Sequence, residues 1–134
     1  MYKLVPSVCS YCGTGCGVLF EVLDGRILGT LPLKTHPVNE GKLCIKGWNL
    51  HDYINSPMRL KAPRVRINGR LHQVTWDRAL QFTAKKLQSI IKEQGPDSVG
   101  VLASAKMTNE ENYLLSKFTR AVVGTNNIDH CARL

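Results

Sequence analysis

The segment Cys9-Ser10-Tyr11-Cys12-Gly13-Thr14-Gly15-Cys16-Gly17 organises the first part of the fold, and it carries three cysteines and three glycines in nine residues. It shows no apolar periodicity, and its glycines permit the positive-φ turns that fold a chain back on itself. We therefore expect a loop whose thiols face one point. A fourth cysteine, Cys44, follows after 27 residues between Gly41 and Gly47, so the full spacing is C-x2-C-x3-C-x27-C.

Four thiols at this spacing indicate an inorganic site. Thiolates are soft ligands that suit zinc or an iron–sulfur cluster. Structural zinc sites usually pair two short C-x2–4-C knuckles, whereas three close ligands and one remote ligand are typical of cubane clusters in ferredoxins. The spacing favours a [4Fe–4S] cluster over zinc, and either of these over a disulfide or simple core packing. The predicted ligands are Cys9, Cys12, Cys16 and Cys44.

Length, composition and charge indicate a folded protein without a membrane-spanning helix. A chain of 134 residues is one domain or two small ones, and 43% hydrophobic residues allow a packed core. Lys and Arg number 18 against 10 Asp and Glu, and the net charge of +8 suggests an anionic partner. No apolar run approaches the roughly 20 residues of a membrane helix, and the N-terminus lacks a signal-peptide pattern. We therefore expect a cytoplasmic protein without a membrane span, in a compartment that disfavours disulfides.

Two hairpins are predicted from turn signals. Strand-like runs over residues 18–23 and 26–31 are joined by Asp24-Gly25, which favours a type I′ turn. This hairpin would hold the cysteine-rich loop. A second pair of runs, 64–67 and 70–74, is joined by Asn68-Gly69 in the same way.

Helices and strands alternate in the rest of the chain. Thr75 is a plausible N-cap for an amphipathic helix that Gly95-Pro96 ends, and a continuous apolar run over 98–103 predicts a strand buried on both faces. A capping box at Thr108 and Glu111 begins a helix that runs to Gly124, and another strand begins at Ile128.

The predicted fold class is α+β. A small β-hairpin domain, which would hold the cluster, covers residues 1–57, and the beginning of an α/β domain with parallel strands covers residues 58–134. A single helix–strand–helix–strand unit leaves a sheet edge and one face open, so we expect this second domain to be incomplete.

The cysteines, followed by Ile45-Lys46-Gly47, resemble the N-terminal iron–sulfur segment of molybdopterin-dependent oxidoreductases. The cysteine spacing alone is shared with nitrate reductases and a subunit of complex I. Residues 74–80, 95–98, 108–113 and 123–134 are similar to the catalytic (alpha) subunit of cytoplasmic formate dehydrogenases, and residues 126–134 point most specifically to that enzyme. The resemblance covers essentially the whole chain.

The resemblance implies two cofactors, a [4Fe–4S] cluster and a molybdenum (or tungsten) bis(molybdopterin guanine dinucleotide) shared with the rest of the subunit. Formate and CO2 interconvert at the metal–pterin centre, and the cluster relays the electrons singly. Lys46 matches the family's lysine between the cluster and one pterin, so it is the expected electron relay. Lys106 follows a strand and precedes a helix, where the family places the pterin dinucleotide. The alternative for either lysine is a solvated surface cation.

Further expectations follow from the same resemblance. The partners would be the remainder of the catalytic subunit and ferredoxin-like iron–sulfur subunits, leading to NAD, a hydrogenase or coenzyme F420. The family's metal-binding selenocysteine or cysteine would follow Leu134, and we hypothesise a UGA codon there that was read as a stop. The fragment by itself would hold no catalytic residue and be inactive. Cys131 is expected to be a small buried side chain, and Tyr11 and Trp48 to shield the cluster from water.

Two other classes of function compete. The charge permits a zinc-binding nucleic-acid module, but the basic residues are spread along the chain without an aromatic-interleaved stripe, so no nucleic-acid partner is expected. A ferredoxin-like carrier acting alone is disfavoured because the α/β half would stay open.

Overall fold

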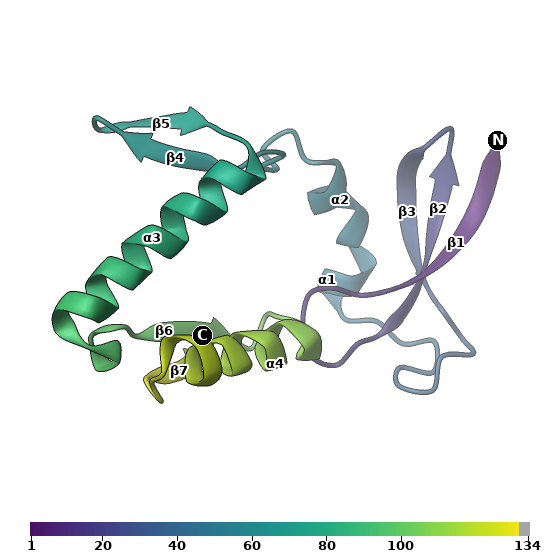
Figure 1. The fold of residues 1–134 in the computed structure, drawn as a ribbon. Coiled ribbons are helices and arrows are strands. Elements are labelled where there is room, and N and C mark those ends of the chain that lie inside the picture. The colour runs from purple at the N-terminus through teal and green to yellow at the C-terminus, as the bar shows by residue number, and fades with distance from the viewer. Residues whose placement is uncertain (132–134) are drawn as a thin grey trace. The chain divides into compact units, whose positions relative to one another are not determined.

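The cysteine-rich loop connects two strands of an antiparallel sheet (Figure 1). The computed structural model describes residues 1–131, and this sheet has the order β1 (Tyr2–Val8), β2 (Gly17–Leu23), β3 (Arg26–Pro32). β1 is absent from the elements expected above, yet it pairs with β2 from Tyr2 opposite Leu23 to Val8 opposite Gly17. Its Pro6 has no N–H to donate, which an edge strand tolerates. The loop is therefore the connection of a β1–β2 hairpin.

The predicted hairpin of β2 and β3 is confirmed. Asp24 and Gly25 have φ values of 48° and 82°, as a type I′ turn requires. The pairing runs from Leu23 opposite Arg26 to Val18 opposite Pro32, with one irregularity between Glu21 and Val22. Because β2 begins directly after Cys16, this hairpin anchors one end of the loop.

Two short helices complete the first part of the chain. These are α1 (Ile45–Trp48) and α2 (Leu50–Asn55), and both contact β3. The core between sheet and helices is small: Val18 and Leu50 are 0% and 1% exposed, and Cys9 is packed with them. The loop that carries the thiols is thus built into the core instead of extending from it.

Two compact units divide the described chain. One contains residues 1–59, 103–115 and 130–131, and the other contains residues 60–102 and 116–129. Residues 132–134, which belong to the closing stretch that points to formate dehydrogenase, lie outside the described residues. Among residues 1–131 there is no helix with the length and apolar character needed to cross a bilayer.

The second predicted hairpin and the first long helix are also confirmed. Strands β4 (Arg64–Ile67) and β5 (Arg70–Gln73) pair around Asn68 and Gly69, which have φ values of 49° and 80°. Helix α3 (Trp76–Gln94) begins at Thr75, whose Oγ1 accepts the Arg78 N–H at 3.3 Å. It ends at Gly95, and a 3-10 turn over Pro96–Ser98 follows.

A parallel strand pair follows as expected. β6 (Val101–Ser104) and β7 (Ile128–Cys131) form a two-stranded sheet. The N–H of Val101 donates to the Asn127 carbonyl at 2.8 Å and that of Ala105 to the Cys131 carbonyl at 3.3 Å. Because the register advances in the same direction on both strands, they run parallel.

Helix α4 (Asn109–Lys117) connects these strands and continues as a π-helical segment, Phe118–Val123. The capping box is confirmed: the Glu111 N–H donates to Thr108 Oγ1 at 3.3 Å, and the Thr108 N–H donates to Glu111 Oε2 at 2.8 Å. Gly124, with φ 86°, ends the segment in the left-handed conformation expected there.

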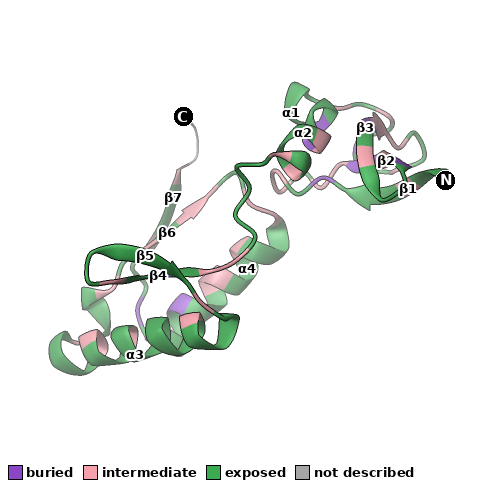
Figure 2. Cartoon of the chain, turned by 90° about the horizontal axis from the view of Figure 1, so that it is seen from above, coloured by how far each residue is buried: buried purple, intermediate pink, exposed green. Residues whose placement is uncertain are grey.

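One prediction about burial is wrong. The apolar run at β6 predicts a strand covered on both faces, but Leu102 is 87% exposed and no residue of β6 is buried. Helix α3 likewise has no buried residue, and Trp76 at its start is 67% exposed (Figure 2). An apolar run shows that a segment is stabilised by burial, but the segment becomes buried only if a neighbouring element covers it. The mixed α+β architecture itself is confirmed.

Candidate metal centre

A backbone hydrogen bond joins the two ends of the cysteine-rich loop. The Cys9 N–H donates to the Cys16 carbonyl at 2.8 Å, which continues the β1–β2 ladder by one step. Between them, the Gly15 N–H approaches the Cys12 carbonyl at 3.4 Å, and Gly15 has φ 65°. This left-handed turn is the conformation that glycine adopts at no steric cost. The first and third thiols of the loop therefore start from adjacent positions of one hairpin.

A buried amide joins the loop to the segment that carries the fourth thiol. Asn39 is 7% exposed, and its Oδ1 accepts the Gly17 N–H at 2.7 Å. Its Nδ2 donates to the carbonyls of Gly17 and Lys42 at 3.1 and 2.9 Å. One side chain thus ties the first residue of β2 to the residue two positions before Cys44.

The four predicted thiols meet at one cavity of about 130 Å³. They come from both ends and the turn of the loop and from the residue just before α1. The lining residues are Cys9, Tyr11, Cys12, Thr14, Gly15, Cys16, Leu43, Cys44 and Gly47.

The thiols influence one another electrostatically. Burial raises the pKa of Cys16, and the neighbouring Cys9, Cys12 and Cys44 raise it further. Cys44 differs, because the backbone N–H of Gly47 lowers its pKa against the opposing effect of burial, and the Lys46 backbone and charge add to the lowering. A set of thiolates crowded in this way is stabilised by a bound cation or metal cluster.

The four cysteines have the donor set of an iron–sulfur cluster, and a cavity lies between them. Within residues 1–131, no group of three His, Cys, Asp or Glu side chains is arranged to hold a single metal ion. A [4Fe–4S] cluster is held by four cysteine thiolates. The donor set and the space between the donors therefore fit that group.

Lys46 lies against the ring of Tyr11, one of the residues that line this cavity. The Lys46 Nζ lies 5.3 Å from the centroid of the Tyr11 ring, within the range of a cation–π contact. Tyr11 lines the cavity, which agrees with its expected shielding role. Trp48 is 43% exposed and is not among the lining residues, so its shielding role stays a prediction.

Lys106 and Cys131 lie at the end of the parallel strand pair, apart from the thiol cavity's lining. Lys106 is exposed between β6 and α4, as predicted, and its N–H donates to Ser104 Oγ at 3.0 Å. Cys131 Sγ lies 3.6 Å from Ser104 Oγ. Hydrogen bonds with Ser104 and with the Ala105 backbone lower the Cys131 pKa, and the Lys106 charge adds to this. Cys131 is half-buried, so it is less covered than the small buried side chain expected there.

Two asparagines are absent from the sequence predictions. Asn39 is the buried amide described above, and Asn109 Nδ2 donates to the Gly13 carbonyl at 2.8 Å across 96 residues of sequence. A Cβ on Gly13 would lie 2.5 Å from Asn109 Oδ1, so the Asn109 side chain would have to move to make room for it. The only sequence signal is the presence of a polar residue near a glycine-rich loop or a capping box, which does not identify a partner so distant.

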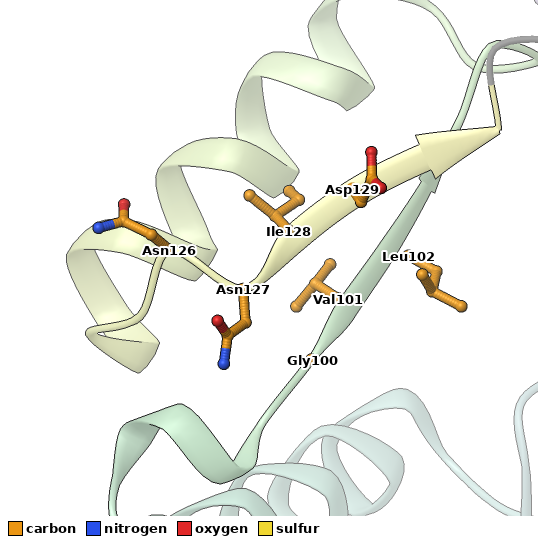
Figure 3. A pocket seen from close by; sticks show the side chains of 7 residues that line it. All are labelled: Gly100, Val101, Leu102, Asn126, Asn127, Ile128 and Asp129. Carbon is orange, nitrogen blue, oxygen red and sulfur yellow. The ribbon is translucent and has the colours of Figure 1, made fainter.

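Two further cavities contain none of the predicted ligands. One, of about 530 Å³, runs along β6 and β7 (Figure 3) and is lined by Gly100, Val101, Leu102, Asn126, Asn127, Ile128 and Asp129. The other, of about 370 Å³, lies beside β3 and α2. Of these three cavities in the described part of the chain, the thiol cavity is the one lined by the predicted cysteine ligands.

Comparison with known protein families supports an iron–sulfur site in the part of the chain that contains the thiol cavity. Residues 2–56 match the molybdopterin oxidoreductase Fe4S4 domain, which defines the first part of the chain as an iron–sulfur domain. Residues 59–134 match the molybdopterin oxidoreductase family model. The chain belongs to the molybdopterin oxidoreductase family and contains its Fe4S4 domain and the start of its molybdopterin domain.

The resemblance to formate dehydrogenase alpha subunits is confirmed. The chain is 51% identical over 130 residues to the F420-dependent formate dehydrogenase 1 subunit alpha of Methanococcus maripaludis, covering 97% of this chain and 19% of that protein. The F420-dependent formate dehydrogenase subunit alpha of Methanocaldococcus jannaschii is 45% identical over 133 residues, with coverage of 99% and 19%. The chain spans about a fifth of the length of these relatives.

The fold is shared with a solved structure whose name gives a different reaction. Acetylene hydratase from Pelobacter acetylenicus superposes with a TM-score of 0.76 at 28% identity, over 93% of this chain and 18% of that one. Because one fold hosts different reactions, this likeness shows the fold and does not identify a reaction.

Proposed function

We propose that this chain is the iron–sulfur part of a formate dehydrogenase alpha subunit and that it relays electrons. Cys9, Cys12, Cys16 and Cys44 would bind a [4Fe–4S] cluster. The observation that carries the proposal is the convergence of these four thiols on one cavity, in a chain 45–51% identical to formate dehydrogenase alpha subunits.

The residues of this chain would have distinct tasks. The thiolates hold the cluster, which when bound supplies one-electron transfer between a molybdenum or tungsten bis(molybdopterin guanine dinucleotide) centre and external carriers. Tyr11 and Leu43 reduce the access of water, and hydrophobic surroundings tune reduction potential. Lys46 supplies a positive charge at the edge of a negatively charged thiolate set and would serve as the relay toward the pterin.

The remaining assignments belong to the same proposal. Residues 1–57 form the iron–sulfur domain, and residues 58–134 begin the molybdopterin domain. Lys106, exposed at the carboxyl end of β6 and before α4, would contact a phosphate of the pterin dinucleotide. The partners are the remaining polypeptide of the catalytic subunit and ferredoxin-like iron–sulfur subunits, with a hydrogenase or F420-reducing protein downstream. The assembly is proposed to work in the cytoplasm.

Metal and sulfide analysis of the anaerobically produced chain tests the proposal. We expect about four iron and four acid-labile sulfide per chain and the broad brown absorption of a cluster. Cys16→Ser should lose most of the iron and sulfide, whereas Cys131→Ser, which changes the one cysteine outside the cavity, should retain them. Circular dichroism checks that both variants keep their helices and strands.

Other outcomes would contradict the proposal. A colourless protein with stoichiometric zinc and no sulfide would support the zinc-binding module instead. Equal loss of iron in the Cys16 and Cys131 variants would show that the cavity does not select the ligands. For the relay, Lys46→Met in the complete enzyme should slow electron transfer to an external acceptor while leaving iron content unchanged, and unaltered turnover would remove Lys46 from the pathway.

A further inference from the structure

A cation–π pair bridges the two segments that supply the thiols. Tyr11 lies between Cys9 and Cys12 in the loop, and Lys46 lies two residues after Cys44 in α1. The Lys46 Nζ is 5.3 Å from the centre of the Tyr11 ring, which itself lines the cavity. The aromatic ring therefore has the cavity and the ammonium group as neighbours.

Few other interactions within residues 1–131 restrict the Lys46 side chain. The residue is exposed, and within residues 1–131 it forms no ion pair with an Asp or Glu. A lysine side chain in water samples many rotamers, which disperses its charge over a wide volume. The negative face of an aromatic ring attracts the ammonium, and at an exposed site this makes the held position about two- to fivefold more populated.

We propose that Tyr11 is a positioning residue, which holds the Lys46 ammonium beside the thiol cavity and thereby makes the bound group easier to reduce. The inference rests on the proposed function, since it concerns the cluster site. A group held by four thiolates becomes more negative when it accepts one electron, and a nearby fixed cation favours that state. Tyr11 therefore acts through Lys46 on the reduction potential.

A simpler role for Tyr11 makes a different prediction. If the ring only excluded water from the cavity, its removal would change the potential whether or not Lys46 were present. If it acts through the ammonium, the effect disappears once the ammonium is gone. A double-mutant cycle separates the two roles.

The experiment measures the midpoint reduction potential of the anaerobically reconstituted 134-residue chain by redox titration followed by electron paramagnetic resonance. The variants are Tyr11→Phe, Tyr11→Leu, Lys46→Met and the Tyr11→Leu/Lys46→Met pair. Tyr11→Phe keeps an aromatic face and should titrate like the unmodified chain. Tyr11→Leu should lower the ratio of reduced to oxidised cluster measurably and by at most about fivefold, which is at most about 40 mV at 59 mV per tenfold.

Lys46→Met should lower the potential at least as much, and adding Tyr11→Leu to it should change nothing further. Tyr2→Leu changes a tyrosine on β1 outside the cavity lining and is the matched control, with no shift expected. An equal shift from Tyr11→Leu with and without Lys46 would overturn the proposal, as would an unchanged potential in Tyr11→Leu.

A second replacement covers the case in which Tyr11→Leu fails to retain the cluster. Exchange of Tyr11 for pentafluorophenylalanine preserves the ring's shape but removes its negative face, so its potential should fall below that of Tyr11→Phe. Equal potentials for these two rings would overturn the proposal. If the unmodified chain binds neither iron nor sulfide, the proposed function fails. If the cluster is present but the potentials do not respond, only the role of Tyr11 fails.

Discussion

Replacement of Asn39 by Ala tests whether the buried amide holds the fourth thiol in place. The substitution removes three hydrogen bonds, one from the Gly17 N–H at 2.7 Å and two to the carbonyls of Gly17 and Lys42. The Gly17 carbonyl still accepts the Leu33 N–H at 3.0 Å. The buried Gly17 N–H, by contrast, loses the partner that the structure gives it.

The expected cost follows from these bonds. A buried donor left unpaired costs about 1–3 kcal/mol, and the lost bond to the Lys42 carbonyl adds about 1 kcal/mol. The sum of about 2–4 kcal/mol corresponds to roughly 30-fold to several-hundred-fold more frequent opening of the segment before Cys44. Iron release from the reconstituted chain to a colorimetric chelator, measured anaerobically, should accelerate by such a factor.

The neighbouring Val38→Ala is the matched control. Val38 is 56% exposed, so its truncation should leave the release rate within about twofold. If Asn39→Ala released iron no faster than Val38→Ala, the amide would not restrain the thiol-bearing segments, and the account of the cavity given above would be refuted.

Three further predictions concern other parts of the chain. Thr75→Ala removes the N-cap oxygen of α3 and should destabilise the helix by about 1 kcal/mol, seen as a lower thermal midpoint by circular dichroism. Gly13→Ala places a Cβ 2.5 Å from Asn109 Oδ1, so the Asn109 side chain should move, lose its bond to the Gly13 carbonyl and thereby reduce iron retention. Ser104→Ala removes the main interaction that lowers the Cys131 pKa, so this pKa should rise, the thiolate fraction at pH 7 should fall, and alkylation of Cys131 by iodoacetamide should slow.

Each of these has its own check. Thr75→Ser preserves the accepting oxygen and should restore the midpoint, and a midpoint unchanged in Thr75→Ala would show that the cap is dispensable. Gly100→Ala adds a Cβ with no atom within 4 Å and should retain iron, so equal loss in both glycine variants would contradict the steric argument. For Cys131, an alkylation rate that stays constant from pH 6 to 9 in both proteins would exclude a thiolate shifted by Ser104.

Turns and helix ends were predictable because their causes are local. Asp24-Gly25 and Asn68-Gly69 adopt the positive φ angles that two-residue hairpin turns require. Thr75 and Thr108 cap helices through bonds to residues three positions away. Since the partners in these interactions are near neighbours in the chain, spacing in the sequence is enough to identify them.

Burial was less predictable because it depends on distant elements. The apolar run at β6 is a real strand, but Leu102 is 87% exposed because no described element covers it. β1 is absent from the expected elements because Pro6 and the polar residues beside it do not indicate a strand. It nevertheless pairs with seven residues of β2. In both cases the deciding contact involves residues outside the segment itself.

Residue types and their positions were enough to identify the four thiols and a spacing that suits a cluster. Both depend only on which residues occupy which places along the chain. Tertiary structure decided how those thiols meet. Asn39 joins two segments 22 residues apart, and Lys46 and Tyr11 come into contact only when α1 packs beside the loop. The physical reason is that hydrogen bonds and cation–π contacts act over a few ångströms in space, whatever the separation along the chain.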